Sequence, residues 1–330
     1  MSLKAKKVLV TGAGGFIGSH LTERLIDLGA HVRAFVRYNS RNDWGLLESL
    51  TKGKLSEVEI VLGDLRDGEA VRQAADTVDI IFHLGSLIAI PYSYVHPRET
   101  IETNVMGTLN VMAAANKAGV ERVVHTSTSE VYGTAQYVPI DERHPLQGQS
   151  PYSASKIAAD KIAESFHRSF GLPVSTIRPF NTFGPRQSAR AVIPTIITQA
   201  LAPGTTMVLG SLRPTRDYTY VDDTVQGFIK VAESDHSVGE TINIGSNFEI
   251  SIGDIAKKVI ATIGVSKQIS LDVNRVRPEN SEVERLWCDN TKAKRLLEWE
   301  PRVSFEEGLS RTIQWISAHR HSYKTDLYNV

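Results

Sequence analysis

The sequence has no cysteine pair, no excess of charge of either sign and no long apolar run. Cys288 is its only cysteine, so no intrachain disulfide can form and a reducing compartment fits. The 37 basic and 37 acidic side chains balance, which argues against a broad basic face for nucleic acid or lipid. The most apolar stretch, residues 80–90, is too short to span a bilayer, and no signal-peptide pattern precedes it. We therefore expect a cytoplasmic protein.

The sequence also lacks a metal-ligand pattern. Its ten histidines show no spacing such as His-Glu-x-x-His, and an isolated histidine is usually a hydrogen-bonded structural residue. We predict no metal. The 330 residues are enough for one large domain or two smaller ones with a sizeable core.

The first half alternates short apolar segments with helical patterns. We expect strands at 8–10, 32–36, 58–62, 79–82, 122–125 and 174–178. The two longest helices are expected at 100–118 and from Tyr152 to just before Gly171. This alternation predicts an α/β fold with a doubly wound parallel Rossmann sheet and helices on both faces.

After Pro179 the pattern is interrupted by five prolines, and we expect only two helices, near 251–263 and 305–318. We interpret residues 1–180 as a Rossmann domain. Residues 181–330 are then a smaller α/β substrate-binding region, packed over the carboxyl edge of the sheet and interleaved with the first domain.

A glycine turn follows the first strand and opens the first helix. Gly12, Gly15 and Gly18 have the spacing G-x-x-G-x-x-G, with Phe16 and Ile17 inside the motif. The first glycine permits the tight turn, the second lets the backbone approach a pyrophosphate, and the third lets the helix pack against the strand. The free N–H groups of the helix N-terminus favour phosphate. The turn therefore predicts a dinucleotide cofactor.

The ends of the second and third strands bear on which dinucleotide binds. Asp64 follows the third strand, where it could contact the adenine or, alternatively, cap the next helix. The second strand ends in Arg37 rather than in the acid that would hold the ribose 2′-hydroxyl of NAD. An arginine suits a 2′-phosphate, which slightly favours NADP without excluding NAD; a solvated surface arginine is the alternative.

A hydroxyl-rich segment and a tyrosine–lysine pair carry the chemistry. Tyr152 precedes Lys156 by four residues, so both lie on one helix face and can move a proton together with a hydride. Glu130, which lies 22 residues before the tyrosine, follows Thr128 and Ser129. A second base is not needed for simple hydride exchange, so the segment predicts a further step on the substrate.

Ordered motifs extend over nearly the whole chain. They are Phe82-His83-Leu84-Gly85-Ser86, Asn104-Val105-Met106-Gly107-Thr108, Arg178-Pro179-Phe180-Asn181, Arg216-Asp217-Tyr218-Thr219-Tyr220-Val221-Asp222-Asp223, Arg277-Pro278 and Trp299-Glu300-Pro301. With the glycine turn and the tyrosine–lysine pair, they resemble the extended short-chain dehydrogenase/reductase family that acts on nucleotide sugars. Within that family, 4-epimerases usually lack a glutamate at position 130.

Glucose-type 4,6-dehydratases carry Thr-Asp-Glu where this chain has Thr128-Ser129-Glu130 and use the aspartate as acid, so the identity of the acid is open here. GDP-mannose 4,6-dehydratases and UDP-glucuronate decarboxylases both carry Ser-Thr-Ser-Glu. Segments 33–45 and 184–190 are most similar to 4,6-dehydratases of legionaminic-acid-type pathways, which act on a nucleotide-linked N-acetylglucosamine. We predict a nucleotide-sugar 4,6-dehydratase, with a 4-epimerase, a decarboxylase or a non-catalytic NADP-binding regulator as alternatives.

The resemblance implies roles for individual residues. Tyr152 deprotonates the sugar 4-hydroxyl, Lys156 favours the phenolate and holds the nicotinamide ribose, and Thr128 binds the 4-oxygen. Glu130 removes the C5 proton, and Ser129 orients the reacting group. Further cofactor contacts are expected from Leu65, Leu84, Ser86, Thr126 and Pro179. Substrate contacts are expected from Ser86, Thr128, Asn181, Arg190, Arg216 and Arg277.

Three further expectations concern ion pairs, structural residues and assembly. The two phosphate-binding arginines, at 216 and 277, could instead pair with Asp222 or Glu279 at the surface. We expect His83, Asp222 and Asp223 to be structural. Family members pair two long helices across a two-fold axis, so the helices at 100–118 and 151–170 are expected to form a four-helix bundle in a homodimer.

Overall fold

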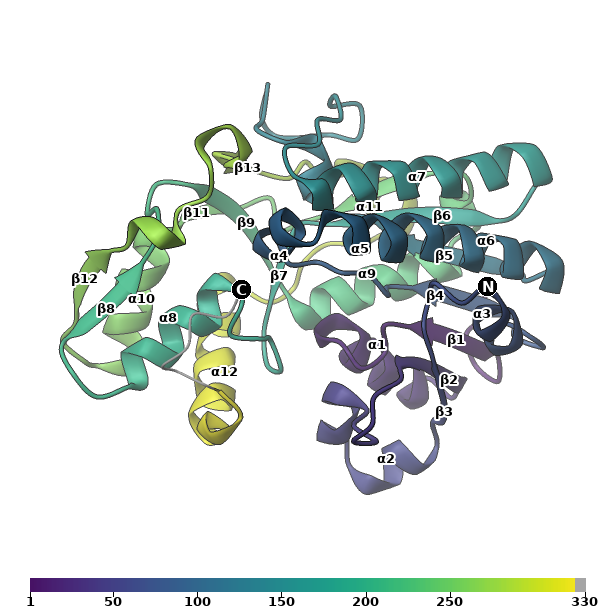
Figure 1. Ribbon diagram of the computed structural model, residues 1–330, viewed down its shortest axis with the longest axis horizontal. Coiled ribbons are helices and arrows are strands. Elements are labelled where there is room, and N and C mark those ends of the chain that lie inside the picture. The colour runs from purple at the N-terminus through teal and green to yellow at the C-terminus, as the bar shows by residue number, and fades with distance from the viewer. Residues whose placement is uncertain (324–330) are drawn as a thin grey trace.

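Seven short strands form one parallel sheet in the computed structural model, which describes residues 1–323 (Figure 1). The strand order is β10-β6-β5-β4-β1-β2-β3, and every neighbouring pair is parallel. The strands are β1 (Lys7–Thr11), β2 (His31–Arg37), β3 (Glu59–Gly63), β4 (Ile80–His83), β5 (Arg122–Thr126), β6 (Val174–Pro179) and β10 (Thr241–Ile244). The first six coincide with the predicted strands to within two residues, which confirms the α/β fold.

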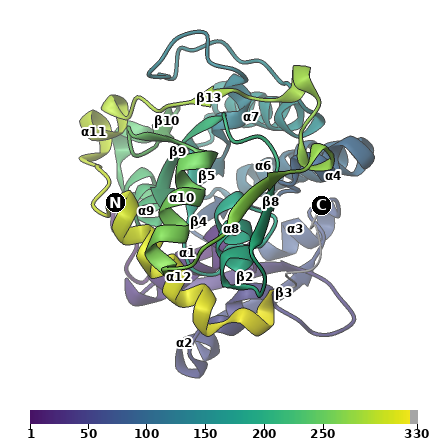
Figure 2. The same cartoon turned by 90° about the vertical axis from the view of Figure 1, so that its left-hand side faces the viewer.

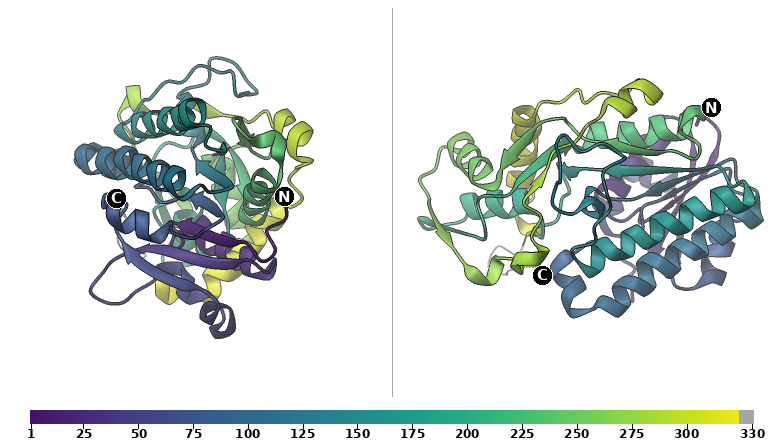
Figure 3. Two further views of the ribbon diagram at one scale, coloured as in Figure 1. Left: turned by 90° about the vertical axis from the view of Figure 1, so that its right-hand side faces the viewer. Right: turned by 90° about the horizontal axis from the view of Figure 1, so that it is seen from above.

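Helices cover both faces of this sheet, and β1 shows why. Val8 and Val10 face the core that contains α1 (Phe16–Asp27) and α9 (Val221–Glu233), whereas Leu9 faces the opposite core. The opposite core is closed by α3 (Gly68–Ala74), α6 (Gly107–Ala118) and α7 (Pro151–Phe170). Alternate residues of a strand point to opposite faces, so continuous apolar strands need helices on both. Figure 3 shows α6 and α7 side by side on one face.

The helix predicted at 100–118 is not a single α-helix. It comprises α5 (Pro97–Ile101), a π-helical turn (Glu102–Met106) and α6. The π turn contains Asn104, whose side chain accepts a hydrogen bond from the Leu87 amide at 2.7 Å and donates to Ser155 of α7 at 2.9 Å. A π turn often marks a functional site, and here it joins the loop after β4 to the helix that carries Tyr152.

The second half is more helical than predicted. The two expected helices are present as α10 (Ile252–Ile263) and α12 (Phe305–Ala318), but α8 (Val192–Leu201), α9 and α11 (Thr291–Leu297) were not predicted. Pro194 lies in the first turn of α8, where backbone N–H groups have no helical partner and proline is tolerated. A proline near the start of a helix is therefore not a helix breaker.

The second half also forms two small sheets, which lie beyond the carboxyl ends of the large sheet (Figures 1 and 2). The strands are β7 (Asn181–Phe183), β8 (Thr206–Leu209), β9 (Thr215–Tyr220), β11 (Glu249–Ser251), β12 (Gln268–Leu271) and β13 (Arg285–Leu286). The short remaining elements are α2 (Lys52–Ser56), α4 (Ile90–Val95) and single turns at 45–49, 129–132, 235–237, 273–275, 279–281 and 320–322.

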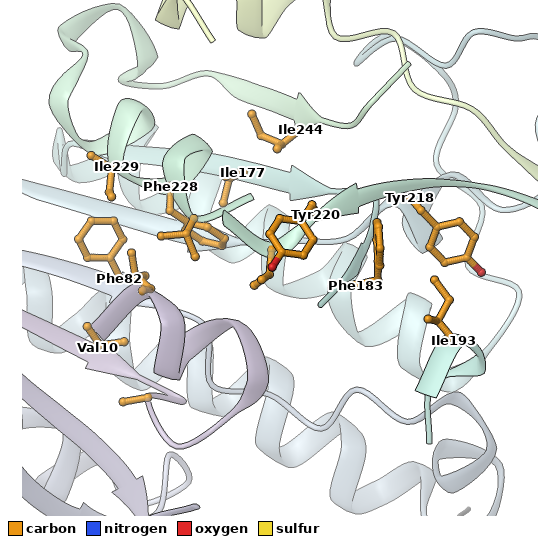
Figure 4. Close-up of a cluster of buried hydrophobic side chains, with 14 of the residues drawn as sticks. Val10, Phe82, Ile177, Phe183, Ile193, Tyr218, Tyr220, Phe228, Ile229 and Ile244 are labelled. Atoms are coloured by element: carbon orange, nitrogen blue, oxygen red, sulfur yellow. The ribbon is translucent and has the colours of Figure 1, made fainter. Parts of the chain in front are cut away.

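One apolar core joins the large sheet to the second half. Figure 4 shows Val10 and Phe82 of the sheet beside Phe228 of α9, and Phe183 beside Tyr218 in the same cluster. Phe183 also packs against Phe305 of α12, with ring centroids 5.2 Å apart. Because this core is shared, the two halves fix one another in position.

Asp223 also fixes the position of the C-terminal segment. Its carboxylate accepts the Val303 amide at 2.9 Å, and its carbonyl accepts the indole N–H of Trp299. Asp222 lies 3.8 Å from Arg311 of α12. No helix within residues 1–323 is long and apolar enough to cross a membrane.

Candidate active site

The glycine turn after β1 leaves no room for side chains. A Cβ at Gly12 would lie 2.7 Å from the Gly85 nitrogen, and one at Gly18 would lie 2.1 Å from the Gly12 oxygen. Gly12 also has a φ of +71°, which favours glycine. The backbone of the turn therefore packs directly against the backbone at Gly85. Helix α1 begins directly after Gly15, and no side chain caps its first amide groups.

A cavity of about 380 Å³ lies over this turn. Of the predicted cofactor residues, it is lined by Gly12, Gly15, Arg37, Asp64, Leu65 and Ser86. An elongated anionic group fits the turn, because a bare backbone and a helix N-terminus meet there. The residues present thus suit the pyrophosphate of a dinucleotide.

The other predicted cofactor residues are not among those that line this cavity. Phe16, Ile17 and Leu84 are partly buried against the apolar core. Within the described residues, the hydroxyl of Thr126 is buried without a hydrogen-bond partner. Pro179 is the last, buried residue of β6.

At the adenosine end, two charged side chains are already paired. The Asp64 carboxylate binds the backbone and guanidinium of Arg66, and the cap of α3 is Asp67 rather than Asp64. Arg37 is largely exposed and lies 3.6 Å from Glu99 of α5. Thus Asp64 faces the cavity but does not cap the following helix.

The loop after β2 lines the same cavity, which the sequence did not indicate. The Asn39 side chain accepts the amides of Arg41 and Asp43 and donates to the Asp43 carbonyl at 2.6 Å. The carbonyl of Gly14 accepts the Leu46 amide, which fastens the loop to the glycine turn. An asparagine followed by polar residues is a turn signal that could have identified this loop.

Helix α7 begins immediately before Tyr152. Ser150 caps the helix in a capping box with Ser153, and Pro151 occupies the first turn, so the start of the helix is fixed. Tyr152 and Lys156 are both buried, and the Lys156 ammonium donates to the Thr126 carbonyl at 2.6 Å. The structure thus brings the tyrosine–lysine pair to the carboxyl end of β5.

The surroundings shift the pKa of both groups. Burial raises the pKa of the Tyr152 phenol, a hydrogen bond with Thr128 opposes this, and the carboxylates of Glu130 and Asp160 add to it. Burial lowers the pKa of Lys156 to about 8, against the attraction of Asp160. Because burial and the nearby carboxylates oppose ionisation of the Tyr152 phenol, its ionisation requires positive charge beside it.

The hydroxyl-rich segment follows β5 and faces Tyr152. Thr128 accepts the Glu130 amide at 3.2 Å and so starts the turn at 129–132. Ser129 is nearly fully buried, whereas Glu130 is only partly buried. The Glu130 carboxylate acts on both Tyr152 and Tyr218; burial raises the pKa of Tyr218 to about 12, and Glu130 contributes to that rise.

Two predicted phosphate-binding arginines converge on one carboxylate that the sequence did not single out. Arg216 lies 3.3 Å and Arg277 lies 3.7 Å from Glu282. The alternative pairings with Asp222 and Glu279 are not formed, since Asp222 pairs with Arg311. Arg216 is buried and Arg277 is half-buried, and two arginines that share one carboxylate keep an excess of positive charge, which suits a diphosphate.

The remaining predicted substrate residues lie around these arginines or near α4. Among the described residues, the buried amide oxygen of Asn181 on β7 has no hydrogen-bond partner, and the Arg277 nitrogen that lies 3.7 Å from Glu282 has none either. Arg190 is exposed and lies near Tyr92 of α4; a hydrogen bond to Glu99 raises the pKa of Tyr92, and the Arg190 charge opposes this. Within the described residues, no group of three histidine, cysteine or acidic side chains could hold a metal ion.

The Rossmann sheet, the glycine turn and the tyrosine–lysine pair at the end of β5 define an NAD(P)-binding enzyme of the extended short-chain dehydrogenase/reductase class. The family model for GDP-mannose 4,6 dehydratase matches residues 9–312, and the chain belongs to that family of nucleotide-sugar dehydratases, epimerases and decarboxylases.

Similar proteins within the family differ in reaction. The chain is 33% identical to UDP-glucose 4-epimerase of Mycolicibacterium smegmatis over 94% of its length and 98% of that protein. It is 34% identical to UDP-N-acetyl-alpha-D-glucosaminuronate decarboxylase of Bacillus cytotoxicus over 94% and 97%. A dTDP-glucose 4,6-dehydratase structure from Streptomyces venezuelae, with NAD bound, has a TM-score of 0.83 and 30% identity over 96% of this chain and 99% of that one.

Proposed function

We propose that this enzyme is a nucleotide-sugar 4,6-dehydratase that forms a 4-keto-6-deoxy sugar, with a UDP- or GDP-linked N-acetylglucosamine as substrate. The observation that carries the proposal is a partly buried carboxylate, Glu130, whose charge acts on Tyr152. Oxidation at C4 makes the C5 proton acidic, and a base beside the oxidising pair is what elimination then requires.

The proposed mechanism gives each residue a role. NAD(P) held over the glycine turn would supply the hydride acceptor for C4 and the hydride donor for C6. The Tyr152 phenolate takes the proton of the 4-hydroxyl, Lys156 stabilises the phenolate by its charge, and Thr128 hydrogen-bonds the 4-oxygen. Glu130 removes the proton from C5 and passes it to the hydroxyl that leaves C6, so water departs; after C6 receives the hydride, C5 regains a proton from solvent. Asn181, Arg216 and Arg277 bind the diphosphate, and Arg190 and Ser86 contact the sugar.

The epimerase and decarboxylase alternatives predict different product masses. Incubation with UDP-, GDP-, CDP- and dTDP-sugars followed by mass spectrometry should show loss of water from a UDP- or GDP-linked N-acetylglucosamine. A product of unchanged mass would indicate epimerisation, and loss of carbon dioxide from a uronic acid would indicate decarboxylation. Either result, without any dehydrated product, would replace the proposal.

Glu130→Gln separates oxidation from elimination. We expect the variant to keep C4 oxidation, seen as reduction of the bound cofactor, but to lose C5 deuterium exchange and dehydration by about 10²–10⁴-fold, the usual contribution of a general base. The control is Glu284→Gln, which removes an exposed carboxylate. Full dehydratase activity in Glu130→Gln would exclude this role for the glutamate.

We also propose that the enzyme prefers NADP, with Arg37 as the contact to the 2′-phosphate. Arg37 lines the cavity. Within the described residues its ion pair is a 3.6 Å contact with Glu99, which would break when the arginine binds the 2′-phosphate. Arg37→Ala should weaken NADP binding about tenfold or more, as expected for a charge-assisted hydrogen bond, and leave NAD binding unchanged. Titration of both cofactors against wild type and the exposed control Arg98→Ala tests this. Unchanged NADP affinity would contradict it.

We propose, finally, that the enzyme is a homodimer in which the helices at 100–118 and 151–170 form a four-helix bundle. Ile101 and Met106 are 47% and 46% exposed on the first of these segments, which leaves an apolar face uncovered. The double variant Ile101→Glu, Met106→Glu should sediment as a monomer at micromolar concentration, whereas Leu271→Glu on β12 should remain dimeric. A wild-type monomer under these conditions would refute the dimer.

A further inference from the structure

Three consecutive residues at the end of β5 hold two charged side chains of α7. The Thr126 carbonyl accepts the Lys156 ammonium, while His125 and Ser127 contact Asp160 at 3.1 Å and 2.7 Å. Asp160 follows Lys156 by four residues, so it lies one helical turn further along the same face. Side chains of a strand alternate in direction, so those of His125 and Ser127 point to the same face. Both therefore reach Asp160 in the next turn of the helix.

Asp160 is held in place on every side. Besides the contacts from β5, Arg178 of β6 donates to it at 2.9 Å and 3.3 Å, and the carboxylate is 5% exposed. Burial alone would raise the pKa of Asp160, but its hydrogen bonds and the Arg178 charge lower it to about 2. The carboxylate is therefore ionised throughout the neutral range.

Arg178 is in turn held from its other side. It donates to the Tyr132 hydroxyl at 3.0 Å, and that hydroxyl donates to Asn243 of β10 at 2.7 Å. The Arg178 guanidinium also lies over the Tyr132 ring, 5.0 Å from its centroid. This buried chain of hydrogen bonds holds the Arg178 side chain in one orientation, and the Asp160 carboxylate that Arg178 binds is held with it.

The groups that face Lys156 come from three elements. His83 of β4 and His125 of β5 are fully buried, and burial lowers the pKa of both, so they are neutral near pH 7. Asp160 acts on it from α7, and Tyr152 lies one helical turn before it on the same helix. Asp160 thus provides the negative charge beside the lysine within the described part of the chain.

We propose that Asp160 is a positioning residue whose fixed carboxylate keeps Lys156 protonated and directed at Tyr152 while the tyrosine loses its proton. The inference rests on the proposed role of the tyrosine–lysine pair, which dehydration, epimerisation and decarboxylation share. Arg178 offsets the cost of burying the carboxylate, and the negative charge of the carboxylate stabilises the protonated form of Lys156.

The state of Lys156 can be measured without any substrate. Competitive labelling with acetic anhydride over a pH series, read by mass spectrometry, gives its pKa in wild type and in Asp160→Asn. Removal of an adjacent opposite charge should lower this pKa by about one unit or more. Glu164→Gln, one turn further on and solvent-facing, is the matched control and should leave it unchanged.

A double variant guards against loss of folding. Asp160→Asn leaves Arg178 buried and unpaired, whereas Asp160→Asn with Arg178→Gln removes both charges together. The pKa of Lys156 should fall in the double variant as well, because Asp160 acts on the lysine directly. An unchanged Lys156 pKa in the folded double variant would overturn the inference and leave only a structural ion pair.

Activity supplies a separate readout. The basic limb of the pH profile for cofactor reduction by nucleotide sugar should move to lower pH in Asp160→Asn, since the lysine loses its proton sooner. A wild-type enzyme that reduces no cofactor with any nucleotide sugar would count against the proposed function, and the labelling result would still decide the role of Asp160.

Discussion

The attachment of α7 to the carboxyl end of β5 is the constraint on which the site depends. The Thr126 carbonyl and the side chains on either side of it fix both Lys156 and Asp160. In a parallel sheet the carboxyl ends of β1, β4 and β5 meet at one edge, so this attachment places the tyrosine–lysine pair at the same edge as the glycine turn. The proposed cofactor site and the proposed proton-transfer pair therefore lie at one edge of the same sheet.

This edge of the sheet contains several buried charges, which are costly unless each is paired and hydrogen-bonded. Asp160 and Arg178 meet that requirement through four hydrogen bonds that join three elements. Lys156 has a carbonyl partner instead of a carboxylate, so its positive charge remains available to the phenol. Apolar residues in place of Asp160 and Arg178 would be buried at a lower free-energy cost, but they would not supply the charge that acts on Lys156.

Local patterns were enough to predict the first six strands, the glycine turn and the tyrosine–lysine pair. Strand periodicity and glycine spacing are set by neighbouring residues and need no tertiary context. The convergence of Arg216 and Arg277 on Glu282, and the place of β10 in the large sheet, depend on contacts between distant segments. Asp160 did carry a local signal, its four-residue spacing from Lys156, but only the contacts from β5 and β6 show what holds it.

The hydroxyl-rich segment leaves one question, which group protonates the departing C6 hydroxyl if the reaction is dehydration. Ser129 has little acidity near neutral pH and is 3% exposed, so it is poorly placed to donate a proton. Glu130 is open to the site and acts on both Tyr152 and Tyr218. A carboxylate that has just taken the C5 proton is a carboxylic acid, and it can pass that proton to the leaving hydroxyl. One residue would then serve as base and acid in turn, which removes the need for the aspartate found in glucose-type enzymes.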